Sequence, residues 1–153
     1  MDVRTAPGSR RNPQFNRADM GLWLPEAGIS YRWEPRLGGF RRPRDGSPNL
    51  ALAHPSFRGY ADYMLTEEFR SALGQVLEDA RREPTAVMCA ETLWWRCHRR
   101  LIADAATLAF EADVAHLAPG GKRGPHRLTE GARLAADGQV IYDVATTVKL
   151  EVQ

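Results

Sequence analysis

Two cysteines and their polar neighbours are the side chains of this sequence best suited to chemistry. Cys89 and Glu91 end the apolar run 87–91, and Cys97 and His98 follow shortly after it. A thiolate is a nucleophile, and a carboxylate or an imidazole transfers protons. We therefore predict a reactive site in which Cys89 is the nucleophile, Glu91 the acid or base and His98 the proton partner.

Each of these side chains also has a structural interpretation. Cys89 closes an apolar segment, where a packed, inert thiol is as common as a reactive one. Glu91 could stabilise the start of the helix expected after it, and His98 could be a hydrogen-bonded anchor. Cys97 lies four residues before Leu101 on the apolar face of that helix, so we expect it to pack in the core.

Basic and polar residues elsewhere could hold an anion beside the thiol. A helix that begins near Leu93 would direct its free N–H groups to the same place, and these groups with nearby guanidinium groups would lower the pKa of Cys89. The predicted ligand is an anionic small molecule or a nucleotide. Its expected contacts are Arg4, Ser9, Arg10, Asn12 and Arg99.

A metal site is the second chemical interpretation. Cys89, Cys97, His98 and either His116 or His126 would make a set of two thiolates and two imidazoles. Zinc ligands are usually paired two to four residues apart, and adjacent residues on one helix reach a single ion poorly. We therefore assign no metal ligands and no cofactor at this stage.

A nucleic-acid-binding surface is the third interpretation. The Pro-, Arg- and Gly-rich segment 34–55 is expected to be a long loop, and its arginines could contact phosphates while nearby aromatic rings stack on bases. The residues concerned are Arg41, Arg42, Arg44 and Arg58 with Trp33, Phe57 and Tyr60.

The elements that would position these groups alternate between strands and helices. This order predicts a single α/β domain over 1–153, with three layers and a mainly parallel sheet whose first strand is short. Arg4, residues 89–91 and His116 would then meet at the carboxyl edge of the sheet. The expected strands are 2–4, 29–33, 85–89 and 113–117, the expected helices are 17–27, 57–64, 66–80 and 93–110, and a loop and hairpin tail over 118–153 turns at Asp137-Gly138.

Composition limits the class of protein. The chain has 153 residues, of which 43% are hydrophobic and 26% charged, and this is ordinary for a globular domain. No apolar run reaches the roughly 18 residues that span a bilayer, and no leader is apparent, so we expect a cytoplasmic protein without membrane contact. A net charge of +2 is too small to indicate nucleic acid by itself. The oligomeric state stays open.

Several motifs in order resemble the bacterial and archaeal family catalogued as domain of unknown function 488. The resemblance implies a flavodoxin-like or Rossmann-like parallel sheet, with a pocket at the Arg4, 89–91 and 97–99 positions, and it implies no reaction. Family members usually carry a strand and a helix before the first motif, so we interpret this chain as shortened at its start. The motifs are Asp2-Val3-Arg4, residues 9–16, Leu37-Gly38-Gly39, residues 57–64, residues 88–91 and Cys97-His98-Arg99.

Overall fold

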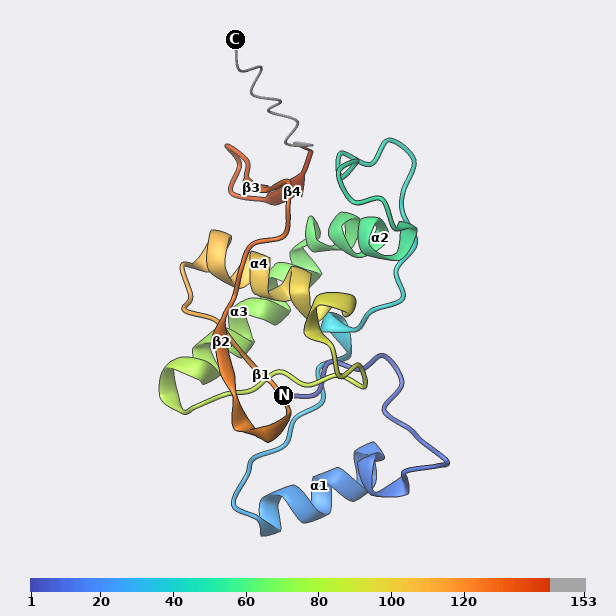
Figure 1. Cartoon of the computed structure of the whole chain (residues 1–153), viewed down its shortest axis with the longest axis vertical. Coiled ribbons are helices and arrows are strands. Elements are labelled where there is room, and N and C mark those ends of the chain that lie inside the picture. The colour runs from blue at the N-terminus through green and yellow to red at the C-terminus, as the bar shows by residue number, and fades with distance from the viewer. Residues whose placement is uncertain (144–153) are drawn as a thin grey trace.

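The computed structural model describes residues 1–143, and helices dominate it (Figure 1). The strands are short and form two separate antiparallel hairpins. Single turns of 3-10 helix lie at Pro13–Phe15, Pro35–Leu37, Trp94–Arg96 and Pro119–Gly121. The helices are α1 (Arg17–Glu26), α2 (Pro55–Met64), α3 (Glu67–Arg82) and α4 (Arg99–Phe110), and the strands are β1 (Ala115–Leu117), β2 (Arg123–Pro125), β3 (Ala132–Leu134) and β4 (Val140–Tyr142).

The predicted three-layer domain with a mainly parallel sheet is wrong. Within residues 1–143, parallel pairing is limited to two single bridges, in which Asp2 pairs with Trp33 and with Met88. Proline follows the 29–33 segment closely and precedes the 85–89 segment, which leaves little room for a ladder. The flavodoxin-like or Rossmann-like sheet implied by the family resemblance is therefore absent from the described part of the chain.

The expected strand 113–117 also pairs differently. It contains β1, whose His116 stands opposite Gly124 of β2 in antiparallel register. Gly120 and Gly121 both have positive φ and turn the chain back after β1. A parallel strand needs a long crossover, whereas this short glycine turn makes a hairpin.

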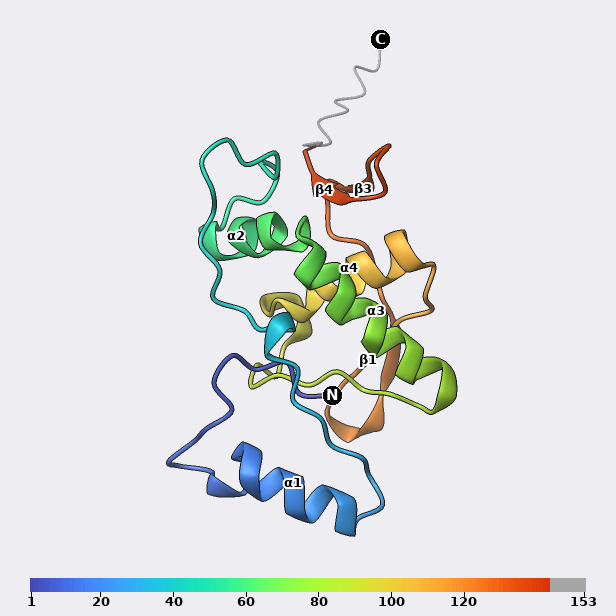
Figure 2. The ribbon, with the colours of Figure 1, turned by 180° about the vertical axis from the view of Figure 1, so that it is seen from behind.

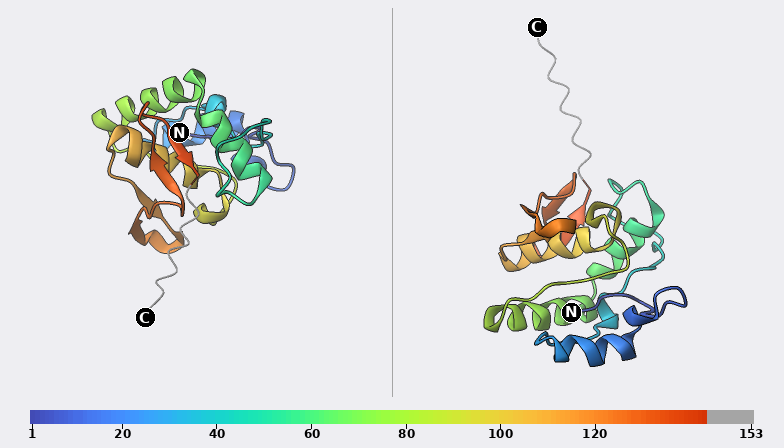
Figure 3. Two further views of the ribbon diagram at one scale, coloured as in Figure 1. Left: turned by 90° about the horizontal axis from the view of Figure 1, so that it is seen from above. Right: turned by 60° about the horizontal axis from the view of Figure 1, so that its bottom comes forward.

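Three helices and the last hairpin are confirmed close to their expected bounds. In α3, the Thr66 hydroxyl accepts a hydrogen bond from the Phe69 N–H, and apolar residues at helical spacing face the core. The β3–β4 hairpin turns at Gly138, which has a φ of 79°. Figure 3 shows this hairpin lying across α4.

The expected helix 93–110 begins later than predicted. Trp94–Arg96 is a single 3-10 turn, Cys97 is extended with φ −119° and ψ 152°, and α4 begins at Arg99. The Trp94 ring lies flat on the His116 ring with centroids 3.6 Å apart. This long-range packing outweighs the helical pattern of the sequence, because propensity is a weak local preference.

The core lies where α2, α3 and α4 pack together. Its fully buried members include Val3, Tyr60, Phe69 and Leu101. Figures 1 and 2 show the amino-terminal segment between this helical group and α1, which lies at the far end of the molecule from β3 and β4. Alternate residues of that segment face opposite sides, so Val3 faces the core while Asp2 and Arg4 face away from it.

The expected long loop over 34–55 is mostly irregular, although it contains the 3-10 turn Pro35–Leu37 and its last residue already begins α2. The buried carboxylate of Asp62 on α2 holds part of this loop in place. Asp62 accepts hydrogen bonds from the Ser47 hydroxyl, the Asn49 amide and the Arg44 backbone N–H. Within the described range, no helix has the length and apolar character needed to cross a membrane.

Candidate metal centre

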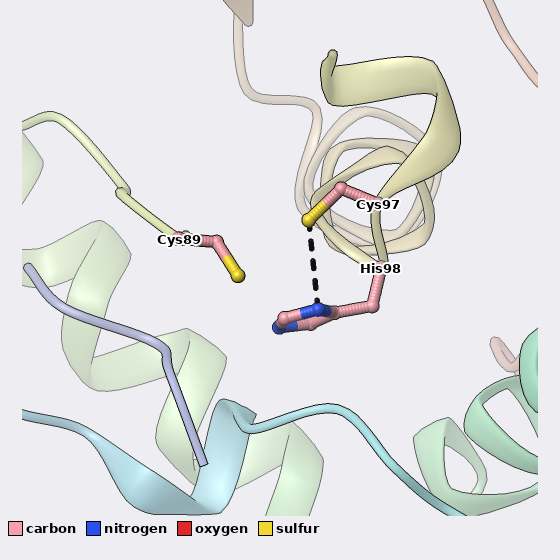
Figure 4. A group of neighbouring side chains, drawn as sticks. All are labelled: Cys89, Cys97 and His98. Atoms are coloured by element: carbon pink, nitrogen blue, oxygen red, sulfur yellow. Dashed lines mark hydrogen bonds between the residues drawn. The ribbon is translucent and has the colours of Figure 1, made fainter. Parts of the chain in front are cut away.

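Cys89, Cys97 and His98 come together in the structure. Their two sulfur atoms and one ring nitrogen all lie within 4.8 Å of one another. Figure 4 shows Cys89 approaching from the segment before the 3-10 turn, while Cys97 and His98 approach from the start of α4. The extended conformation of Cys97 lets two adjacent side chains face the same point, which the expected helix would have prevented.

Hydrogen bonding leaves one nitrogen of His98 free to act as a ligand. Its Nε2 lies 3.3 Å from the Val3 carbonyl oxygen, and because a carbonyl only accepts, Nε2 carries the proton. Nδ1 then has its lone pair and lies 3.6 Å from the Cys97 sulfur. Metal-binding histidines are commonly oriented in this way, by a backbone carbonyl on the second ring nitrogen.

Packing fixes the His98 ring in this orientation. The Tyr60 ring lies against it, with centroids 5.0 Å apart. On another side, a Cβ added to Gly39 would lie 3.0 Å from His98 Nδ1. Glycine at position 39 thus allows the backbone to approach the imidazole closely.

The two thiols have opposite pKa shifts. The neighbouring Cys89 thiol, and after it the N–H groups of Arg99, lower the pKa of Cys97 to about 6 despite its burial. The Arg99 guanidinium donates to the Cys97 sulfur from 3.4 Å. The interaction with Cys97 and burial raise the pKa of Cys89 to about 12. At neutral pH the pair therefore holds one thiolate, on Cys97.

Backbone N–H groups near the cluster favour negative charge on sulfur. The N–H of Glu91 acts to lower the pKa of Cys89, and the N–H of Arg99 acts to lower that of Cys97. For Cys89 this effect is outweighed by the interaction with Cys97 and by burial, so Cys97 alone is prepared for ligation as a thiolate and Cys89 must lose its proton when a metal binds.

The expected catalytic set is only partly assembled. Cys89 and His98 are neighbours, but the Glu91 side chain is exposed. The backbone carbonyl oxygen of Glu91 accepts a hydrogen bond from Arg99. The lowered pKa expected for Cys89 belongs to Cys97 instead. Cys97 is 2% exposed, as expected for a core residue, and it also faces the cluster. The catalytic roles stay predictions.

The expected anion contacts do not gather around the thiols. Arg4 forms a buried ion pair with Asp2, with its nitrogen 2.6 Å from the carboxylate oxygen, on the side that contacts Met20 of α1. Met88 pairs with Asp2 in a parallel bridge, and side chains alternate along an extended chain. The next residue, Cys89, therefore faces the same side as Val3, opposite to Arg4. The remaining predicted contacts, Ser9, Arg10 and Asn12, lie in the loop before α1, where the Ser9 hydroxyl accepts from the Asn12 N–H. Of the five, only Arg99 contacts the cluster.

The other two histidines proposed as ligands belong to a separate network. His116 Nε2 lies 2.8 Å from His126 Nδ1, and His126 Nε2 lies 2.8 Å from the buried Asp104 carboxylate. Burial and His126 lower the pKa of His116 to about 4. Tyr142 also donates to Asp104. Sequence reasoning missed Asp104, because nothing near it in sequence marks it as a hydrogen-bond acceptor.

The residues considered for nucleic acid have contacts within the protein. Tyr60 is buried, so its ring is not available to stack on a base. The Arg41 guanidinium lies over the Tyr63 ring at 3.8 Å, and Arg58 donates to the Leu52 carbonyl. The Trp33 indole donates to the Arg4 carbonyl. Arg42 and Arg44 are exposed.

Comparison with known proteins yields one family. The family model described as "Domain of unknown function DUF488" matches residues 1–106. The match includes Cys89, Cys97, His98 and Asp104 and stops short of both hairpins. No curated protein and no solved structure matches the chain significantly.

Proposed function

Since the chain belongs to the family described as domain of unknown function DUF488, which assigns no activity, we propose from the site alone that it is a metal-binding protein. Its ligands are the thiolates of Cys89 and Cys97 and Nδ1 of His98. The observation that carries the proposal is the convergence of these three atoms within 4.8 Å.

The ligand chemistry favours zinc or a similar soft transition metal. Two thiolates and one imidazole are a common zinc set, with bonds of about 2.3 Å to sulfur and about 2.1 Å to nitrogen. In a tetrahedral site, such bonds place sulfur and nitrogen about 3.6 Å apart, and Cys97 Sγ and His98 Nδ1 are separated by 3.6 Å. The Cys89 sulfur needs only a small movement to complete the set.

Three protein ligands would leave one coordination position for water or a substrate. Within residues 1–143, no fourth histidine, cysteine or carboxylate belongs to the group. Structural zinc sites usually have four protein ligands, whereas catalytic zinc sites have three and an open position. A bound ion would act there as a Lewis acid and would lower the pKa of a coordinated water. Arg99, which donates to Cys97, would adjust the charge on the ligands.

Metal analysis tests the proposal. The full chain, purified reduced and without chelator, is expected to hold about one zinc ion per molecule. The variants Cys89→Ser, Cys97→Ser and His98→Gln each remove a ligand and should lower the content severalfold or more. His54→Asn is the matched control, because His54 is exposed and lies outside the cluster.

Cobalt substitution provides a second measurement that does not depend on purification history. Thiolate-to-cobalt charge-transfer absorption is expected in the native chain, and it should weaken in both serine variants but persist in His54→Asn. A native chain without metal or cobalt absorption would refute the proposal. So would serine variants that are folded by circular dichroism and retain a full equivalent of metal.

A further inference from the structure

A second concave site lies away from the metal centre. It is a cavity of about 520 Å³ between the start of α2, the 3-10 turn at Trp94–Arg96 and the segment after β2. Cavities of about 300–1,000 Å³ suit small organic ligands. Neither the cysteines nor His98 line it, so it is independent of the proposed function.

Aromatic rings form part of its wall. Phe57, Trp94 and Trp95 all line the cavity. The Trp94 ring is held flat against His116 and is edge-on to Trp95, with centroids 5.7 Å apart. Trp95 is 48% exposed. Rigid, partly exposed indoles provide flat surfaces for a planar ring.

Arg100 brings a positive charge to the same wall. Its guanidinium lies 4.6 Å from the centre of the Phe57 ring and donates one hydrogen bond, to the Trp95 carbonyl oxygen. Among residues 1–143, no carboxylate lies within ion-pair distance of Arg100, while most of its N–H groups have no acceptor. Arg127 adds a second guanidinium to the lining and Glu130 an exposed carboxylate.

Two residues of the cavity lining each contain a polar atom that is closed to solvent and lacks a hydrogen-bond partner. These atoms are Arg100 Nε and the Thr129 hydroxyl oxygen, and the described residues contain only one other such atom, in Thr107. The Thr129 backbone is fixed, because its N–H donates to Asp104 from 2.9 Å. Buried polar groups are nearly always paired, so these two lining side chains keep hydrogen-bonding capacity that a side-chain rotation would offer to a ligand.

We infer that this cavity binds a small molecule with a planar aromatic ring and an oxyanion, either a carboxylate or a phosphate. The ring packs against the tryptophans, and the oxyanion accepts hydrogen bonds from Arg100 and Thr129. A guanidinium fork matches either oxyanion.

Four probe compounds test separately whether the aromatic ring and the oxyanion are recognised. They are 2-naphthoate, 2-naphthyl phosphate, the neutral 2-naphthamide and inorganic phosphate, each titrated into the full chain. We expect saturable binding of one or both aromatic anions, and the one bound more tightly identifies the preferred oxyanion. The neutral amide and inorganic phosphate should bind at least about tenfold more weakly, because each lacks one half of the recognised group.

The tryptophan indole N–H signals in NMR spectra locate the binding. The sequence has four tryptophans, and the signals of Trp94 and Trp95 should shift on binding while those of Trp23 and Trp33 stay in place. Arg100→Gln should weaken binding of the aromatic anions about tenfold or more, and Thr129→Val by a smaller factor.

Arg123→Gln is the matched control, because Arg123 is exposed on β2 and does not line the cavity. Unchanged affinity in folded Arg100→Gln and Thr129→Val would overturn the inference. Equal shifts of all four indole signals, or equal binding of the neutral amide, would also overturn it. If Arg100→Gln fails to fold, Thr129→Val and the indole shifts still decide the outcome.

Discussion

At the scale of single residues, the two thiols of the cluster differ in pKa. Cys89 is half-buried, and Cys97 is buried. The neighbouring Cys89 thiol lowers the pKa of Cys97, and the Arg99 guanidinium donates a hydrogen bond to the Cys97 sulfur. Negative charge therefore concentrates on Cys97. The sequence pattern favoured Cys89, because its position before an expected helix is visible in the sequence while the position of Arg99 against Cys97 is not.

The first residue-scale prediction concerns the reduced, metal-free chain. Because the pKa of Cys97 is lowered to about 6 and that of Cys89 is raised to about 12, one thiolate should form near pH 6 and no second one below pH 9. Ultraviolet thiolate absorbance against pH measures this. Cys97→Ser should abolish the early step, and Cys89→Ala should move it to higher pH.

The same shift has a consequence for stability. A lowered folded-state pKa stabilises the fold at high pH, and the contribution is lost as the pH falls from about 9 through about 6. Chemical denaturation of the native chain should therefore show stability rising over this interval, and Cys97→Ser should flatten the rise. Two thiols that titrate together above pH 8 would contradict both expectations.

At the scale of secondary-structure elements, some features could be predicted from the sequence and others could not. The helix expected over 66–80 corresponds to α3, and the turn expected at Asp137-Gly138 connects β3 to β4. The expected parallel sheet is wrong, because an apolar segment such as 85–89 does not specify its partner or the length of its pairing. The site could not be predicted for a similar reason. Cys97 and His98 converge because the expected helix 93–110 is interrupted before Arg99.

One element-scale prediction concerns the contact between α2 and the loop before it. A Cβ on Gly59 would overlap the Arg41 carbonyl oxygen and lie 2.6 Å from the Pro43 nitrogen. Backbone atoms cannot yield as a flexible side chain can, so we expect Gly59→Ala to lower the free energy of unfolding by about 1–3 kcal/mol. Chemical denaturation measures the change.

Gly74 provides the matched control for this substitution. It lies within α3, and its added Cβ would meet only a Phe110 ring atom at 3.9 Å. Gly74→Ala should raise stability by about 0.5–1 kcal/mol, because alanine favours a helix interior. Equal effects of the two substitutions would show that helix propensity rather than close packing decides at position 59.

At the scale of the whole molecule, Asp104 connects regions that are distant in sequence. Its carboxylate is fully buried and accepts hydrogen bonds from His126, from the Thr129 backbone and from the Tyr142 hydroxyl. These partners lie in or beside the two hairpins. Helix α4 therefore holds both hairpins through one charged side chain, in addition to their apolar contacts.

The whole-molecule prediction tests this connection. Tyr142→Phe removes a 2.9 Å hydrogen bond to the buried carboxylate and should lower the free energy of unfolding by about 1.5–3 kcal/mol, the usual range for a charged acceptor. Tyr63→Phe is the control, because Tyr63 donates to the neutral Arg36 carbonyl and should cost about 1 kcal/mol. A smaller effect at Tyr142 than at Tyr63 would contradict the role given to Asp104.

The position of Asp104 has a practical consequence for anyone who trims this chain. The family match ends at residue 106, just after Asp104, whereas its hydrogen-bond donors follow between residues 126 and 142. A recombinant fragment cut at the family boundary would end inside α4 and would lack every one of these donors to Asp104. Expression plasmids should therefore encode at least the first 143 residues, whichever of the two sites is under study.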